Sequence, residues 1–358
     1  MGQTMRAIQK IDTSPGLVFK HDIAIPKITA PDDVLIKVKA TAICGTDVSI
    51  YESDESLMHR MARALPVITG HECCGHVVAY GNGVNHLKEG DYVSSEMHII
   101  CGRCYNCRHG NGHVCLDTVI KGVDGDGCFA EYVKVPAGNV VLLDDSIPYE
   151  IAAFMDAFGN AVHTTNSVEI TAKQVAVLGC GSIGLMAIAV ARHCGAAEIL
   201  ATDINDNYLN IAQKMGADYV FNVRNEQEHQ KFIDKSRSDS GRLGVDVVLE
   251  MSGNPAAISD ALTIVRMGGD VSLLGLPHKP ITINLSDDVI FKGIDIHGII
   301  GRRMFDTWYR MIAYIKSGLG DKLMLLVTHR LQLEDFEKGF EAKRNGRAMK
   351  VIFYPNGE

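Results

Sequence analysis

The chain has 358 residues, of which 46% are hydrophobic and 22% charged, a composition typical of a globular protein with two domains. Lysine and arginine together number 35 against 43 aspartates and glutamates, and the net charge of -8 gives no electrostatic reason to expect a nucleic acid partner. No apolar run reaches membrane-spanning length, and the N-terminal stretch MGQTMRAIQKID is too polar for a signal peptide. We therefore expect no membrane association and a cytoplasmic protein.

The first 150 residues are predicted to form mainly β-structure. Short apolar runs begin at Ala7, Gly16 and Asp33 and are separated by turn residues, and residues 129–135 alternate as a strand does. After Glu150 the pattern changes to that of a helix, IAAFMDAFGNAVHTT, which carries Asp156 on an otherwise apolar face. A buried carboxylate needs a partner, which a metal, a ligand or simply the end of the helix could supply.

Cys44, His71 and Glu72 are candidate ligands of a catalytic zinc ion. Catalytic zinc sites use thiolate, imidazole and carboxylate ligands and keep one position open for water or substrate. Each residue alone also has a structural interpretation, Cys44 as a small buried apolar group, His71 as a hydrogen-bonded core histidine and Glu72 as a surface carboxylate. The three together favour the metal site.

Four clustered cysteines, Cys101, Cys104, Cys107 and Cys115, carry the strongest signal in the chain. The spacing Cys-x2-Cys-x2-Cys-x7-Cys lets one loop place four thiolates around a tetrahedral ion, which predicts a structural zinc site. Disulfides and an iron–sulfur cluster are the alternatives. A cytoplasmic location disfavours the first, and the second lacks the proline that often follows the last cysteine.

Residues 173–203, KQVAVLGCGSIGLMAIAVARHCGAAEILATD, predict a dinucleotide-binding strand, turn and helix. Gly179, Gly181 and Gly184 allow a tight turn close to a pyrophosphate, at the positive end of the helix that starts near Ser182. Asp203 follows the next strand, where its carboxylate can bind the ribose hydroxyls and repel a 2′-phosphate. This favours NAD over NADP, although Asp203 could instead cap a helix that begins near Asn207.

From residue 173 onward, strands near 175, 199, 219, 246 and 271 alternate with helices near 183, 207, 227 and 256. This order predicts a doubly wound parallel, or Rossmann, sheet. Trp308 is predicted to be buried, in a helix that follows this sheet along the chain. The strand-like residues 349–353 are expected to return to the first domain.

With these motifs together, the chain resembles the medium-chain, zinc-dependent alcohol dehydrogenases over essentially its full length. Cys-Gly-Thr-Asp from Cys44, Gly-His-Glu from Gly70, the four cysteines and the later glycine turn carry the resemblance. Within that family the chain looks most like the L-threonine 3-dehydrogenases. The stretches CGRCYNCRHGNGHVC, DAFGNAVHT and GRRMFDTWYRM support this.

The resemblance implies an enzyme with a mainly β, GroES-like catalytic domain (residues 1–152 and 296–358) and an NAD-binding Rossmann domain (residues 153–295). It implies that Cys44 and His71 bind the catalytic zinc, that Glu72 is a third or exchangeable ligand, that Asp156 lies at or beside the metal, and that His98 lies near the substrate; His98 could also belong to a surface loop. It further implies one catalytic and one structural zinc per chain, a homo-oligomer that is a dimer or tetramer, and NAD contacts. The residues expected to contact NAD are Ile183, Asp203, Leu274, Gly275, Leu276, Ile299 and Ile300.

The expected reaction is the oxidation of a secondary alcohol, most simply L-threonine to 2-amino-3-ketobutyrate, with hydride transfer to NAD. Zinc would lower the pKa of the alcohol, and Thr46 would accept its proton and pass it to the ribose, Ser49 or water. Ser49 stands where threonine dehydrogenases usually have a histidine, and Tyr208 where the family commonly has an arginine. A polyol, cyclitol or other secondary alcohol is the alternative substrate, and a redox-inactive NAD-binding protein is the alternative function.

Overall fold

The computed structural model describes residues 3–237 and 243–357, which divide into two compact units. Unit 1 consists of Met1–Ala157 and Leu326–Glu358, and unit 2 of Phe158–Leu325. Residues 296–325 thus lie with the second unit, whereas the sequence assigned them to the first domain. The domain boundaries expected from the resemblance, between residues 152 and 153 and between residues 295 and 296, remain a prediction.

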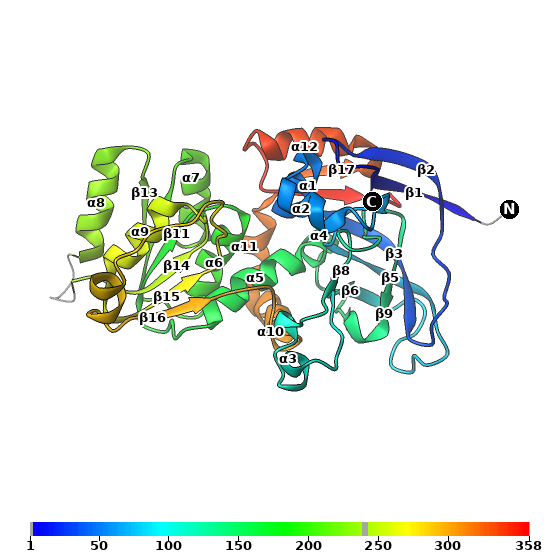
Figure 1. Ribbon diagram of the computed structural model, residues 1–358, viewed down its shortest axis with the longest axis horizontal. Helices are drawn as coiled ribbons and strands as arrows, with labels where there is room; N and C mark the ends of the chain where they lie inside the picture. Colours follow the sequence, from blue (N-terminus) through cyan, green and yellow to red (C-terminus); the bar gives the residue numbers. More distant parts are fainter. Residues whose placement is uncertain (1–2, 238–242, 358) are drawn as a thin grey trace. The chain divides into compact units, whose positions relative to one another are not determined.

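Unit 1 is mainly β-structure, as the sequence predicted, and most of its strand pairs are antiparallel (Figure 1). Its largest sheet has the order β10-β6-β5-β3-β18-β17, with β9 also paired to β3, and two smaller sheets have the orders β2-β1-β4 and β7-β8. The strands are β1 (Thr4–Lys10), β2 (Val18–Ala24), β3 (Asp33–Ala42), β4 (Val67–Ile68), β5 (Cys73–Tyr80), β6 (Tyr92–Ser95), β7 (His98–Ile99), β8 (Val119–Ile120), β9 (Tyr132–Pro136), β10 (Val140–Leu142), β17 (Val327–Gln332) and β18 (Lys350–Tyr354).

The C-terminal strand β18 returns to the first unit, as predicted. It pairs antiparallel with β3 and parallel with β17, and all of its residues are buried. Phe353 packs edge-on against Phe129, which also contacts Phe340 from the helix α12 (Phe336–Arg344). The tail of the chain therefore completes the core beneath the loops that carry Cys44 and His71.

Few helices belong to unit 1, and they connect or cover its strands. They are α1 (Gly45–Glu52), α2 (Glu55–Met61), α3 (Tyr105–Arg108), α4 (Tyr149–Ala153) and α12 (Phe336–Arg344). Helix α5 (Met155–Asn166) spans the division between the units, with Asp156 in its first turn.

Unit 2 contains a parallel sheet of order β13-β12-β11-β14-β15-β16, which confirms the predicted Rossmann topology (Figure 1). The chain moves outward in one direction from β11 and in the other from β14, so right-handed crossovers place helices on both faces. Its strands are β11 (Gln174–Leu178), β12 (Glu198–Asp203), β13 (Tyr219–Asn222), β14 (Val245–Glu250), β15 (Val265–Leu273) and β16 (Asp295–Gly298).

Four helices of unit 2 begin within one residue of the positions predicted near 183, 207, 227 and 256: α6 (Ser182–His193), α7 (Asp206–Met215), α8 (Glu226–Arg237) and α9 (Pro255–Ile264). The predicted helix that carries Trp308 is α10 (Asp306–Tyr314), whereas α11 (Gly320–Met324) was not predicted. Every residue of β11 and β14 is buried, as expected for strands covered on both faces. Trp308 in α10 is fully buried, which confirms its assignment to the core. Among the described residues, no helix is both long and apolar enough to cross a membrane.

Candidate functional site

Cys44 lies at the N-terminus of α1, immediately after the buried end of β3. It is the N-cap residue in an extended conformation, and its backbone N–H donates a 2.8 Å hydrogen bond to Oδ2 of Asp47 in the first turn of the helix. Thr46 and Ser49 follow on α1, both half-buried and three residues apart, so they lie on the same face of the helix.

His71 and Glu72 lie between β4 and β5, directly after Gly70. The backbone of Gly70 has φ of 87°, and a Cβ atom there would overlap the ring of Phe129. The tight turn carries both side chains into the interior, where His71 is 5% exposed and Glu72 fully buried. The structure thus rejects the alternative that Glu72 is a surface carboxylate.

Cys44, His71 and Glu72 come together, with one ligand atom from each lying within 4.8 Å of the others. Oδ1 of Asp47 lies 3.5 Å from Nδ1 of His71. Burial lowers the pKa of His71, but the negative charges of Asp47 and Cys44 outweigh it and hold that pKa well above its usual value. The surroundings thus favour positive charge at this point, and the donor set is that of a catalytic zinc site with a carboxylate behind its histidine.

Lys350 in β18 forms a buried ion pair with Glu72. Its Nζ lies 2.9 Å from Oε1 and 2.7 Å from Oε2, and the side chains of both residues are at most 2% exposed. Both carboxylate oxygens of Glu72 are therefore engaged by one ammonium group. A zinc ion that takes Glu72 as a ligand has to share this carboxylate with Lys350.

Asp156 and His98 form a second group, together with Glu96. Ligand atoms of these three residues also lie within 4.8 Å of one another. Asp156 is 4% exposed and close enough to affect Glu72 electrostatically. Burial raises the pKa of Glu72, the positive charge of Lys350 lowers it, and the negative charge of Asp156 raises it, so that the pKa lies above its usual value. His98 belongs to the short strand β7, and a quarter of its side chain is exposed. Asp156 therefore acts on Glu72 of the first group through its charge, but its ligand atom belongs to the group that it forms with His98 and Glu96.

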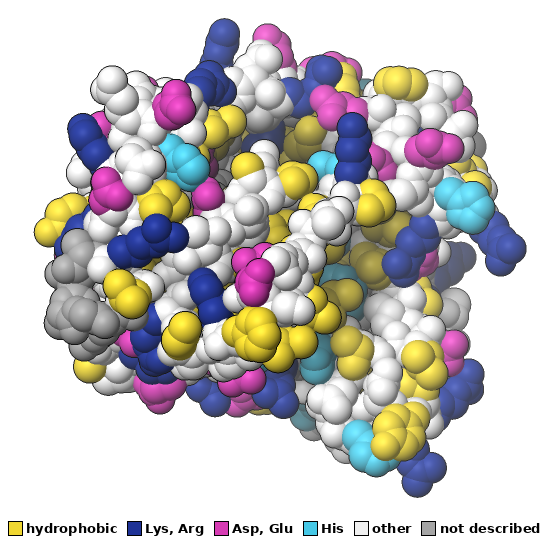
Figure 2. All heavy atoms as spheres, turned by 60° about the vertical axis from the view of Figure 1, so that its left-hand side comes forward, with side chains coloured by type: hydrophobic (Ala, Val, Ile, Leu, Met, Phe, Trp, Pro, Cys, Tyr) yellow, Lys and Arg dark blue, Asp and Glu magenta, His cyan; other side chains and the backbone are white. Residues whose placement is uncertain are grey.

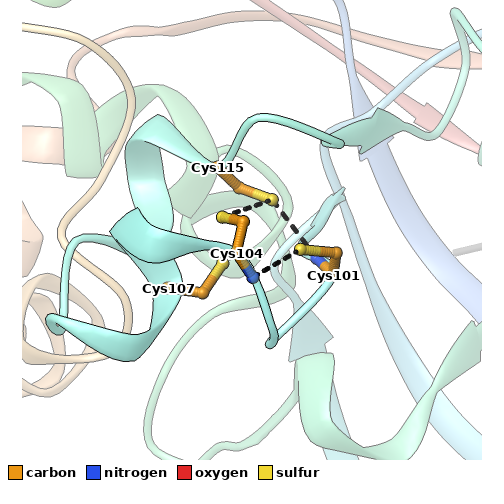
Figure 3. A group of neighbouring side chains, drawn as sticks. All are labelled: Cys101, Cys104, Cys107 and Cys115. Carbon is orange, nitrogen blue, oxygen red and sulfur yellow. Dashed lines mark hydrogen bonds between the residues drawn. The ribbon is translucent and has the colours of Figure 1, made fainter.

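The four cysteines Cys101, Cys104, Cys107 and Cys115 converge, as Figure 3 shows. Their sulfur atoms lie within 4.8 Å of one another, and those of Cys104 and Cys115 are 3.9 Å apart. A tetrahedral zinc ion with Zn–S bonds of about 2.3 Å requires sulfur atoms about 3.8 Å apart. All four cysteines are free thiols, so the disulfide alternative is wrong.

Backbone donors surround these sulfur atoms. The N–H groups of Cys101 and Asp117 point at Sγ of Cys115, and that of Cys104 at Sγ of Cys101, at 3.3 to 3.4 Å. Backbone hydrogen bonds from Cys107 and Leu116 lower the pKa of Cys104 to about 6. They favour the thiolate, the form that binds a metal ion.

The glycine turn has the geometry of a pyrophosphate cradle. Gly179 has φ of 99°, and a Cβ atom on Gly184 would overlap the carbonyl oxygen of Gly179. Gly181, the N-cap of α6, has nothing within 4 Å of the place where a Cβ atom would stand. A ligand can therefore approach this backbone and the N-terminus of α6 closely.

Asp203 ends β12 and takes part in the same turn. Its Oδ2 accepts the N–H of Cys180 at 2.7 Å, and its Oδ1 accepts those of Ile204 and Asn205 at 2.8 and 2.9 Å. The alternative role as the cap of α7 is wrong, because the side chain of Asn205 caps that helix. A cavity of about 640 Å³ opens beside Asp203, lined also by Gly179, Tyr208 and Ser252. This volume suits the adenosine half of a dinucleotide.

The other expected NAD contacts lie at the carboxyl edge of the same sheet. Ile183 is in the first turn of α6, Leu274 to Leu276 follow β15, and Ile299 and Ile300 follow β16. Cofactors bind at this edge in doubly wound sheets. The contribution of each residue remains a prediction.

Sequence reasoning missed three side chains beside the predicted ligands. Asp47 ends the motif Cys-Gly-Thr-Asp, Glu96 lies two residues before His98, and Lys350 is the sole charge in the run Lys350–Tyr354. A charge inside a buried strand indicates a buried partner, which is the signal that Lys350 offered.

Two families of known proteins match this chain, one in each unit. Residues 30–145 match the family described as alcohol dehydrogenase GroES-like domain, and residues 182–317 match zinc-binding dehydrogenase. The L-threonine 3-dehydrogenase of Caldanaerobacter subterraneus subsp. tengcongensis is 47% identical over 92% of this chain and 93% of its own length. That of Symbiobacterium thermophilum is 43% identical over 99% of both chains.

A solved structure that is named for a different substrate shows the same fold. The 2R,3R-butanediol dehydrogenase of Bacillus subtilis is 29% identical, with a TM-score of 0.86 over 99% of this chain and 100% of its own. The chain therefore belongs to the zinc-dependent medium-chain alcohol dehydrogenase family and is an oxidoreductase with zinc and NAD as its cofactors.

Proposed function

We propose that this enzyme oxidises the secondary hydroxyl of L-threonine, giving 2-amino-3-ketobutyrate and NADH. The choice of substrate rests on one observation: the chain is 47% identical to an L-threonine 3-dehydrogenase over 92% of its length, whereas its sequence identity to the butanediol dehydrogenase is 29%. Oxidation of a polyol or other secondary alcohol is the alternative.

Cys44, His71 and Glu72 would hold the catalytic zinc, and the four clustered cysteines the structural one. When bound, zinc supplies a Lewis acid that lowers the pKa of the alcohol, and NAD supplies the hydride acceptor. Asp47 supports this assignment from behind His71, because such carboxylates fix the orientation of a histidine ligand.

Thr46 is the proposed first acceptor of the alcohol proton. It follows the ligand Cys44 by two residues, and Ser49 lies one helical turn further along the same face of α1. A hydroxyl group can accept a proton in one hydrogen bond while it donates its own in another. Thr46 and Ser49 can thus pass a proton along the helix, with water or the ribose completing the path.

Asp203 is the proposed ribose ligand and the reason for the preference for NAD. Three backbone donors hold its carboxylate in place, and a 2′-phosphate would meet this negative charge. The open approach at Gly181 and the N-terminus of α6 support pyrophosphate binding there.

For threonine, the ammonium group requires an acceptor, and Asp156 is a better candidate than Glu72. Both oxygens of Glu72 already bind Lys350, whereas Asp156 lies with His98 in a separate group. Arg302, a cation in the motif GRRMFDTWYRM that could bind a substrate carboxylate, is almost fully buried in unit 2, where it contacts Asn160. His98, which lies with Asp156 and is a quarter exposed, is the proposed second contact of the substrate.

The test is NADH formation by purified, zinc-loaded enzyme with L-threonine, 2R,3R-butanediol, sorbitol and inositols. We expect kcat/KM for L-threonine to exceed that for each neutral alcohol by at least about tenfold, which corresponds to one charge-assisted hydrogen bond. Turnover of a polyol without turnover of threonine would reject the substrate but retain the reaction.

We further propose a cytoplasmic homo-oligomer, a dimer or tetramer. Strand β16 ends the described sheet of unit 2, and Ile296 on it is 40% exposed. Exposed apolar side chains lie near it in sequence: Leu276, Leu285, Ile290, Phe291, Ile300 and Tyr309. Figure 2 shows hydrophobic side chains among charged ones on the face that it draws. An edge strand with exposed apolar side chains near it favours pairing with a second copy. A monomeric mass by light scattering would contradict this.

A further inference from the structure

Glu96 is a fully buried carboxylate outside the predicted ligand sets. It lies between β6 and β7, and Asn139 holds the backbone on both sides of it. The N–H of Glu96 donates to the carbonyl of Asn139 at 2.9 Å, and Nδ2 of Asn139 donates to the carbonyls of Glu96 and His98 at 2.7 and 3.1 Å. The segment from Glu96 to His98 is thus fixed by three hydrogen bonds.

The carboxylate of Glu96 is directed at His98. Its Oε1 accepts the backbone N–H of His98 at 3.1 Å and lies 3.1 Å from Nδ1 of the ring. A carboxylate oxygen can only accept, so Nδ1 must carry the hydrogen in this contact. In the neutral ring Nε2 is then the acceptor nitrogen.

We propose that Glu96 is a positioning residue, which fixes the ring orientation and the Nδ1–H tautomer of His98 so that Nε2 meets the substrate. The proposal rests on the proposed function, since it requires that His98 lies at the substrate. It also defines what His98 recognises: a neutral ring held in this way accepts a hydrogen bond from an ammonium or hydroxyl group, rather than donating one to a carboxylate.

The position of the group supports this role. Asp156, the proposed acceptor for the substrate ammonium, has a carboxylate oxygen within 4.8 Å of the ligand atoms of Glu96 and His98. His98 is only partly buried, so packing alone leaves its ring more freedom than that of His71. A buried anion hydrogen-bonded to both its backbone and its ring removes that freedom.

A double-mutant cycle on the zinc-loaded enzyme tests the proposal with Glu96→Ala, His98→Ala and the double variant. We expect Glu96→Ala to raise KM for L-threonine by about tenfold to a hundredfold, with little change in KM for NAD. Because Glu96 acts through His98, adding Glu96→Ala to His98→Ala should cost no more. Glu96→Gln keeps the accepting oxygen and should recover most of the affinity.

The tautomer provides a readout that does not depend on turnover. In ¹⁵N NMR spectra of the wild type, Nδ1 of His98 should carry the hydrogen, and in Glu96→Ala it should move largely to Nε2. Glu131→Gln is the control, since Glu131 binds Arg6 on unit 1 away from this group and should change neither readout.

Additive effects of the two alanine substitutions, or the same tautomer with and without Glu96, would overturn the proposal. If the wild type does not oxidise threonine, the proposed function fails, while the NMR experiment still decides whether Glu96 sets the tautomer. If Glu96→Ala does not fold, Glu96→Leu decides in its place, because leucine keeps the volume but has no accepting oxygen, and the hydrogen of His98 should then move to Nε2.

Discussion

Replacing Lys350 by methionine is expected to lower the free energy of unfolding by about 3 to 5 kcal/mol, the usual cost of removing one partner of a buried ion pair. The variant leaves the carboxylate of Glu72 fully buried without the ammonium group that binds both of its oxygens. Methionine has a similar length and fills the same apolar volume in β18, so packing contributes little to the change. Urea unfolding of the zinc-loaded enzyme measures it.

The double variant Glu72→Gln/Lys350→Met is the matched control. It removes both charges, so most of the lost stability should return, whereas activity should not if Glu72 takes part in zinc binding. A single Lys350→Met variant as stable as the wild type would contradict the buried ion pair as described.

Replacing Cys44 by serine is expected to reduce NADH formation by about a thousandfold, the equivalent of about 4 kcal/mol of lost Lewis-acid stabilisation. Serine keeps the shape of the side chain but provides a neutral hydroxyl in place of a thiolate ligand. The increase of NADH absorbance with time in the steady state measures the rate. Cys194→Ser in unit 2, where the thiol contacts Tyr314, is the control and should retain the wild-type rate.

The elements of unit 2 could be predicted because their signals are local. The apolar run before Gly179, the glycine turn and the acidic end of β12 lie within about thirty residues, and each βα unit repeats the same pattern. The four cysteines are similarly local, since one loop supplies all of them. In both cases the spacing along the chain reports directly on the geometry in space.

The surroundings of the catalytic group could not be predicted in the same way. Lys350 and Glu72 are 278 positions apart and meet only because β18 returns to β3, next to the strand that follows Glu72. Glu96 and His98 are only two positions apart, but the pattern of polar and apolar residues does not show that the carboxylate of Glu96 turns toward the ring of His98. Asp203 shows a further limit: its place was predicted, but its contact with the N–H of Cys180 in the glycine turn and its contacts with the N–H groups of Ile204 and Asn205 were not.

Whether Cys44 holds a zinc ion that the reaction needs is tested by counting zinc by mass spectrometry in the same preparations whose rate with L-threonine is measured. We expect two zinc ions per wild-type chain and one in Cys44→Ser, with the loss of activity following the loss of that one ion. A Cys44→Ser enzyme that forms NADH at the wild-type rate, or a fully active wild type with a single zinc ion, would contradict this expectation.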